Sequence, residues 1–183
     1  TKTDGTLWSW GYNSKGPLGQ GDRTSHSSPV QIPGTTWPTN DDQLSSCSYA
    51  AIAIKTDGTM WVWGQNNGGN LGLNQGHNSG NKSSPTQIPG SWTNGKLARG
   101  GNNGAANHVV KSDGTLWNWG WNEQGELGQN NTTDYSSPKQ VGTSTNWSHI
   151  RRGDSCVLGF KTDGTMWAWG YPVAGMLGQN DIV

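Results

Sequence analysis

Histidine side chains are the first candidates for chemistry in this chain, as metal ligands or as general acids and bases. The four histidines are His26, His77, His108 and His149, and each lies at a different distance from the nearest Asp-Gly-Thr segment. None has the close spacing to another histidine or to a cysteine that zinc sites usually show. We therefore expect scattered loop or strand histidines, with no metal and no cofactor.

Carboxylates and thiols give an equally weak signal for catalysis. Asp41 and Asp42 are the only adjacent acidic pair, and neighbouring side chains of a strand point apart, whereas a glycosidase needs facing carboxylates. Cys47 and Cys156 stand at different distances from the repeated segment described next, which predicts two small buried thiols rather than a mutual disulfide. These patterns predict no catalytic residue and a chain that is not an enzyme.

An eight-residue segment, Asp-Gly-Thr-[Leu/Met]-Trp-x-Trp-Gly, occurs four times and organises the sequence. The copies span residues 4–11, 57–64, 113–120 and 163–170, and they begin 53, 56 and 50 residues apart. Each copy is followed by Gly-x-Leu-Gly, at 16–19, 69–72, 125–128 and 175–178, and three copies continue to Ser-Ser-Pro, at 27–29, 83–85 and 136–138. A period near fifty residues most often encodes four short strands stacked radially on their neighbours.

Each repeated segment predicts a β-hairpin that turns at Asp-Gly. This pair is the preferred two-residue turn where both central residues need positive φ. The turn glycines are Gly5, Gly58, Gly114 and Gly164. Gly, Asn, Ser and Pro interrupt every window in which an apolar helical stripe could develop, so the predicted fold class is all-β.

Tryptophan is the main core residue that the repeat predicts. Trp61 and Trp63 share one face of the strand after the turn, while Met60 and Val62 share the other, so both faces are apolar and the sheets must stack. The expected core tryptophans are Trp8, Trp10, Trp61, Trp63, Trp117, Trp119, Trp167 and Trp169. The second indole of each pair is expected to be buried between blades.

Composition excludes some partner classes. Lys and Arg number 12, as do Asp and Glu, and only 13% of residues are charged, so no basic field exists to attract nucleic acid or anionic lipid. No segment approaches the ~20 apolar residues of a membrane span. We therefore expect no nucleic-acid partner and no membrane insertion.

The repeats resemble the regulator of chromosome condensation repeat family, in which an aliphatic strand, Asp-Gly and an aromatic-x-Trp-Gly strand precede Asn and Gly-x-Leu-Gly. The Asn is present at Asn13, Asn66 and Asn122, whereas Pro172 replaces it in the fourth copy. The resemblance covers essentially the whole chain and implies a β-propeller, typically closed with seven blades. The nucleotide-exchange activity of the founding member is not expected, because its acidic and histidine loop residues have no matching positions here.

Residues 1–183 are expected to form a single array of about 3.5 such repeats, beginning inside one repeat and stopping inside another. Three arrangements are open: the chain is a piece of a longer protein, two copies complete a ring, or an open arc is capped by neighbours. The first is favoured. Half-finished terminal blades predict that a free monomer is marginally stable unless more chain or another protein covers them.

Aromatic residues recur at the loop position directly after the strand glycine, where Tyr12, Gln65, Trp121 and Tyr171 stand. Equivalent loop positions of a propeller form a ring on one surface, and Tyr and Trp supply contact area at low entropic cost. Tyr12, Trp121 and Tyr171 are therefore predicted to bind a partner. The alternative is that these aromatics cover the turn of the adjacent blade.

The predicted function is a non-enzymatic propeller module that binds a protein or glycan partner, or neighbouring subunits of an assembly. The predicted setting is extracellular or a virion, such as a phage fibre, a capsid decoration or a bacterial surface protein. One alternative is a secreted inhibitor of a hydrolase such as a β-lactamase, as bacterial members of the family imply. Another is a propeller lyase or glycosidase.

Overall fold

The computed structural model describes residues 1–47, 49–76, 79–98, 105–153, 156–171 and 177–178. The described residues form four antiparallel sheets and one short 3-10 helix, η1 (Asp41–Gln43). The first sheet pairs β1 (Leu7–Gly11) with β2 (His26–Ile32), and the second has the order β3 (Leu44–Cys47), β4 (Ala50–Ile54), β5 (Met60–Gly64) and β6 (Lys82–Ile88). The third has the order β7 (Lys96–Leu97), β8 (Ala106–Val110), β9 (Leu116–Gly120) and β10 (Tyr135–Gln140), and the fourth β11 (Trp147–Arg152), β12 (Cys156–Lys161) and β13 (Met166–Gly170).

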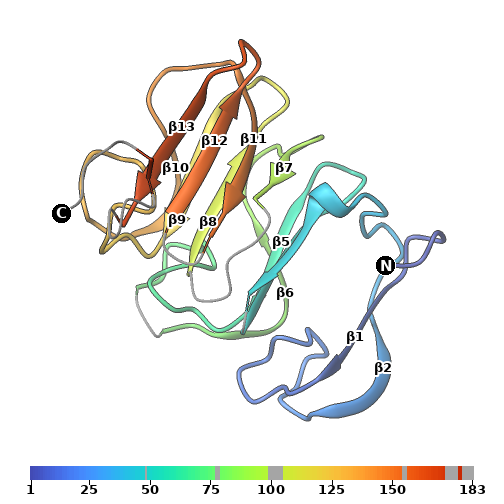
Figure 1. The fold of residues 1–183 in the computed structure, drawn as a ribbon. Helices are drawn as coiled ribbons and strands as arrows, with labels where there is room; N and C mark the ends of the chain where they lie inside the picture. Colours follow the sequence, from blue (N-terminus) through green and yellow to red (C-terminus); the bar gives the residue numbers. More distant parts are fainter. Residues whose placement is uncertain (48, 77–78, 99–104, 154–155, 172–176, 179–183) are drawn as a thin grey trace.

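The four sheets stand side by side in chain order as propeller blades, with β1 and β13 on opposite sides of the array (Figure 1). Within each blade every strand pairs with the next one along the chain. Neighbouring blades meet at their first strands, because β11 contacts β7 and β8 while β7 contacts η1. The predicted all-β architecture is confirmed.

The hairpin turn differs from the predicted two-residue turn. Lys55 N donates to Thr59 O at 2.8 Å and Gly58 N donates to Lys55 O at 2.9 Å, so three residues form the loop. Only the glycine has positive φ, 82° at Gly58. The Asp57 carboxylate accepts hydrogen bonds from Thr59 N and Oγ1, which holds the aspartate in the turn without a left-handed backbone.

Gly114→Ala is expected to lower the free energy of unfolding by about 3 kcal/mol, because it combines a left-handed backbone with a steric clash. Gly114 has φ 77°, and a Cβ there would collide with the carbonyl of Thr145. The matched control is Gly125→Ala, with φ 82° and no atom within 4 Å of the added carbon, which should cost about 1–2 kcal/mol. Urea unfolding compares the two, and equal losses would show that the clash is relieved.

A third set of tryptophans, which the sequence analysis did not select, completes the core. Trp37, Trp92 and Trp147 are all buried and recur every 55 residues. Their backbone N–H groups donate to the carbonyls of the turn glycines of the preceding repeat, at 3.1 Å for Trp37 and 3.0 Å for the other two. Each of these indoles also packs against the second indole of its repeat, edge-on in the pairs Trp37–Trp63 and Trp147–Trp169 and tilted in Trp92–Trp119. The first three hairpin turns are thereby tied to the start of the next blade.

The second indole of three repeats makes the same hydrogen bond to the preceding blade, which we call the interblade indole bond. In each case indole Nε1 donates to the carbonyl of the variable residue in Gly-x-Leu-Gly. The pairs are Trp63 to Pro17 at 2.8 Å, Trp119 to Asn70 at 2.9 Å and Trp169 to Glu126 at 2.8 Å. Trp63 and Trp119 are buried and Trp169 is half-buried.

Two tryptophans predicted for the core are instead exposed. Trp10 is 58% exposed, because no Gly-x-Leu-Gly segment of a preceding blade covers its indole among the described residues. Trp167 is 53% exposed, because β13 is the last strand of its sheet among the described residues, whereas β1, β5 and β9 each pair with a further strand. The first indoles of the other repeats, Trp8, Trp61 and Trp117, are half-buried and donate to the threonine hydroxyl two residues earlier.

Candidate partner-binding face

A buried asparagine fixes the loop that follows the strand glycine in the first three blades. Asn66 Nδ2 donates to the carbonyls of Gln75, Gly76 and Ser79, and its Oδ1 accepts from Leu71 N at 3.2 Å. Asn13 and Asn122 make the equivalent bonds in their own blades, and all three side chains are buried. The loops are therefore held by internal hydrogen bonds, which gives their surfaces a defined shape. The fourth-blade position, Pro172, lies outside the described residues.

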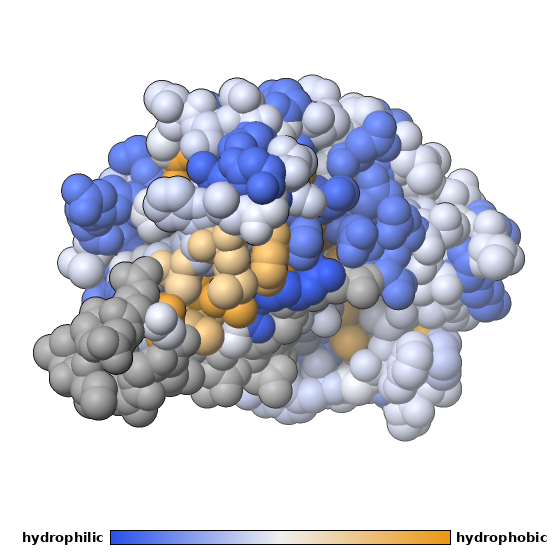
Figure 2. Space-filling view, turned by 45° about the horizontal axis from the view of Figure 1, so that its top comes forward, coloured by the Kyte–Doolittle hydropathy of each residue, from blue (hydrophilic) through white to orange (hydrophobic). Residues whose placement is uncertain are grey.

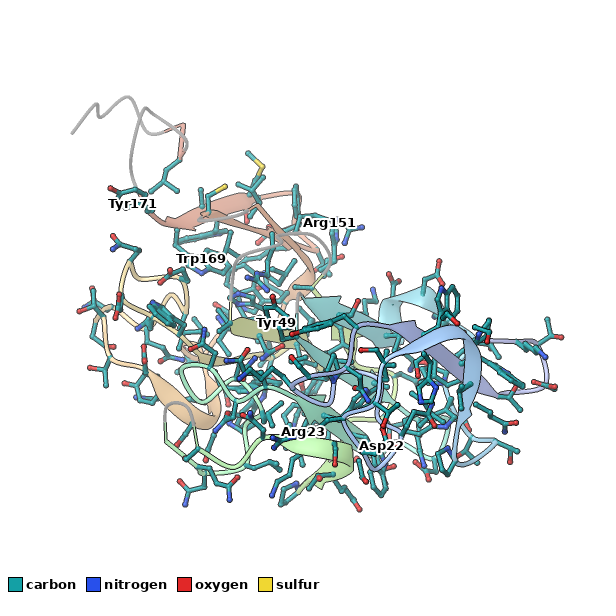
Figure 3. All side chains as sticks on the ribbon, turned by 90° about the horizontal axis from the view of Figure 1, so that it is seen from below. Asp22, Arg23, Tyr49, Arg151, Trp169 and Tyr171 are labelled. Atoms are coloured by element: carbon teal, nitrogen blue, oxygen red, sulfur yellow. The ribbon has the colours of Figure 1, made fainter. Side chains whose placement is uncertain are left out.

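Tyr12 and Tyr49 form an exposed aromatic pair at the end of the sheets where the strand glycines lead into these loops. Tyr12 is 64% exposed and Tyr49 is 45% exposed, and their rings meet edge to face with centroids 6.5 Å apart. Tyr12 follows β1 in the first blade, whereas Tyr49 precedes β4 in the second, so the pair bridges two blades. Figure 3 shows Tyr49 near the middle of the molecule. Tyr49 lies outside the repeated motif and was not predicted.

The other predicted partner-binding residues lie at equivalent chain positions but not in equivalent surroundings. Tyr171 is 40% exposed and lies at the edge of the molecule (Figure 3). Trp121 is half-buried, its backbone N–H donates to Ala105 O, and it packs against Gly68 of the preceding blade. Trp121 therefore contacts the neighbouring blade through its backbone and Cβ. Gln65, the non-aromatic residue at this position, is half-buried.

A second cluster of polar groups lies where the first strands of three blades meet. Asp42, Lys96, His149 and Arg151 line a cavity of about 180 Å³, and Lys96 Nζ donates to Ser148 O at 3.2 Å. Burial lowers the pKa of His149, the positive charges of Arg151 and Lys96 act in the same direction, and Asp42 opposes them. His149 is also stacked on Phe160 at 4.5 Å. Two cations, Lys96 and Arg151, and one carboxylate, Asp42, therefore line the cavity together with this imidazole.

The remaining candidates for chemistry are dispersed. His108 is fully buried in β8, His26 is half-buried in β2, and His77 lies outside the described residues. Cys156 is a free, half-buried thiol. Among the described residues no three His, Cys, Asp or Glu side chains gather closely enough to hold a metal ion. No helix in the described part of the chain is long and apolar enough to cross a membrane.

Stacked antiparallel blades joined by interblade hydrogen bonds define a β-propeller repeat protein. The face of the molecule that Figure 2 shows is mostly hydrophilic, with an apolar patch near its centre. The chain belongs to the family described as Regulator of chromosome condensation (RCC1) repeat, which matches residues 4–38, 57–103 and 113–159. The predicted family resemblance is confirmed.

Relatives of known name are about one third identical to this chain over the aligned residues. It is 30% identical over 149 residues to Ultraviolet-B receptor UVR8 of Arabidopsis thaliana, covering 75% of this chain and 30% of that protein. It is 33% identical over 132 residues to Protein RCC2 of Homo sapiens, covering 70% of this chain and 24% of that protein. The chain therefore spans less than a third of each of these relatives.

Solved structures show the same fold. Human WBSCR16 matches with a TM-score of 0.76 at 21% identity, over 99% of this chain and 47% of that one. Prp20p of Saccharomyces cerevisiae, described together with its binding to Gsp1p and histones, matches with a TM-score of 0.74 at 21% identity, over 100% of this chain and 44% of that one. The described sheets thus correspond to somewhat less than half of a larger propeller.

Proposed function

We propose that this chain is an RCC1-repeat interaction module that binds a protein partner through the loop face that carries Tyr12 and Tyr49. The observation that supports it is the exposed edge-to-face pair of these rings across two blades. Aromatic side chains that are large, rigid and exposed are the residues that most often dominate binding energy at protein interfaces. Prp20p, which shares this fold, is itself described as binding proteins.

The loops around the pair support the same proposal. Because the buried asparagines bond to loop carbonyls, binding need not first order the loops, and less free energy is lost on association. Asp22 and Arg23 are exposed on the loop that Asn13 holds, and they add charges of both signs to this loop. A polar rim around aromatic anchors is typical of protein interfaces.

The double variant Tyr12→Ala, Tyr49→Ala is expected to weaken binding of the partner by at least about 2 kcal/mol, or roughly thirtyfold, because it removes both anchors. The partner would first be isolated from the source organism with the immobilised wild-type chain. Calorimetric titration with the purified partner would then measure the affinity of each variant. Since both tyrosines are exposed, the thermal unfolding transition should not change.

The matched control is Ser112→Ala, which alters an exposed residue in a hairpin turn at the opposite end of the third blade. Its affinity should equal that of the wild type. If the double tyrosine variant binds as tightly as Ser112→Ala does, the loop face is not the binding surface and the proposal fails.

The finer predictions about setting and mode remain proposals. A virion or extracellular location gains no support from UVR8 and RCC2, which are plant and human proteins. The inhibitor alternative predicts that the chain lowers the activity of a secreted hydrolase such as a β-lactamase, and that the double tyrosine variant does not. A glycan partner predicts binding to an oligosaccharide array that is lost in the same variant.

A further inference from the structure

A groove lies on the outer side of the junction between the second and third blades, which we call a seam. Its lining residues lie between Gly72 and Pro138 and include neither tyrosine of the exposed pair. It encloses about 480 Å³, which is within the range of small-molecule sites. Its apolar lining comes from Leu73 and Ile88 of the second blade and from Trp92 and Trp117 of the third, and Lys111 also lines it. We call this space the seam groove.

One residue distinguishes this seam from the two other seams of the chain. Directly after Gly-x-Leu-Gly, the first and third repeats carry Gln20 and Gln129, whereas the second carries Leu73. Gln20 Nε2 donates to Val30 O at 3.1 Å, and Gln129 Nε2 donates to Gln140 O at 3.1 Å, so each glutamine bonds to the outer strand of its own blade. Leu73 cannot make this bond, and it packs against the apolar core instead. The seam groove therefore has an apolar wall where its counterparts have an amide.

A single cation stands over the aromatic side of the seam groove. Lys111 Nζ lies 4.4 Å from the Trp92 ring centre and 4.5 Å from that of Trp117. Among the described residues Lys111 forms no ion pair, and Asp113 is the carboxylate whose pKa its charge lowers. The seam groove thus combines a flat apolar surface with a positive charge that a ligand could neutralise.

We propose that the seam groove binds a small amphipathic anion with a flat apolar body and one carboxylate. The body would lie against Leu73, Ile88 and the two indoles, and the carboxylate would face Lys111. Apolar burial supplies most of the affinity, and the charge orients the ligand. This proposal is independent of the protein partner proposed for the tyrosine face.

The test uses 2-naphthoate as the probe and the indole N–H resonances of the ¹⁵N-labelled chain as the readout. We expect saturable shifts at Trp92 and Trp117, and no comparable shifts at Trp37 and Trp61, which occupy the equivalent seam beside Gln20. The neutral analogue 2-naphthamide should bind about three- to fivefold more weakly, because it lacks the charge that pairs with Lys111. Saturable shifts at both seams, or at neither, would overturn the proposal.

Two variants sharpen the test. Leu73→Gln introduces the residue that two other repeats carry, so it should fold normally and bind 2-naphthoate about tenfold more weakly. Lys111→Met should abolish the preference for naphthoate over naphthamide while leaving naphthamide binding intact. Undiminished naphthoate binding by Leu73→Gln would show that the probe binds elsewhere, and an unchanged preference in Lys111→Met would refute the role of the ammonium group.

Discussion

Trp119→Ala is expected to lower the free energy of unfolding by about 3–5 kcal/mol, the range for a large aromatic side chain lost from a packed core. The Trp119 side chain is fully buried, packs against Trp92 with ring centres 6.1 Å apart, and donates the interblade indole bond to Asn70 O. Its removal leaves a cavity between two blades and a buried carbonyl without its donor. Both effects destabilise the folded state.

The matched control is Trp10→Ala, which removes the same side chain from the equivalent position of the first repeat. Because Trp10 is 58% exposed, we expect a loss below about 1 kcal/mol. Urea unfolding followed by circular dichroism would measure both variants. Equal losses would mean that strand propensity, rather than the contact between blades, accounts for the tryptophan at this position.

The free energy of unfolding is also expected to fall as the pH drops below 6.5, by up to about 1.4 kcal/mol per pH unit from His108 alone. Burial lowers the pKa of His108 from 6.5 to about 3, and the positive charge of Arg152 acts in the same direction, while Asn118 opposes them. Between pH 6.5 and 3 the unfolded chain therefore binds a proton that the folded chain does not. The contribution is fully present above pH 6.5 and is lost as the pH falls toward 3.

The double variant His108→Ile, Asn118→Val isolates this contribution, because the second blade carries Ile52 and Val62 at the same cross-strand positions. Its unfolding free energy should depend less on pH than that of the wild type between pH 6.5 and 5. The turn aspartates also have lowered pKa values, through hydrogen bonds from the threonine two residues on, but they titrate at lower pH. The pKa of His149 is lowered too, but this residue is present in both proteins. Parallel pH profiles would contradict the role of His108.

Features set by periodicity could be predicted from the sequence. Four hairpins, stacked sheets and the burial of Trp63 follow from a strand pattern that repeats at a constant interval. Trp37, Trp92 and Trp147 also recur at a constant interval and could have been selected as core residues. They were missed because their partners are backbone carbonyls, which leave no trace in residue types.

Features that depend on a neighbouring blade could not be predicted in this way. Alternation along a strand tells which residues share a face, but it does not tell whether another blade covers that face, as the exposure of Trp10 and Trp167 shows. Tyr49 lies outside the repeat, so only the structure brings it to Tyr12. The seam groove could not be predicted either, because the sequence does not tell which backbone carbonyls Gln20 and Gln129 bond.

The interblade indole bond always runs from a donor in the later blade to an acceptor in the earlier blade, and it does not depend on the side chain of the accepting residue. The donor is always a tryptophan of the later blade, and the acceptors are the main-chain carbonyls of Pro17, Asn70 and Glu126, three residues with unrelated side chains. The bond therefore requires only the main chain of the accepting residue, so its acceptor is kept when the side chain at the variable position changes. A whole repeat that carries the motif can therefore be duplicated, deleted or exchanged in frame with this bond retained.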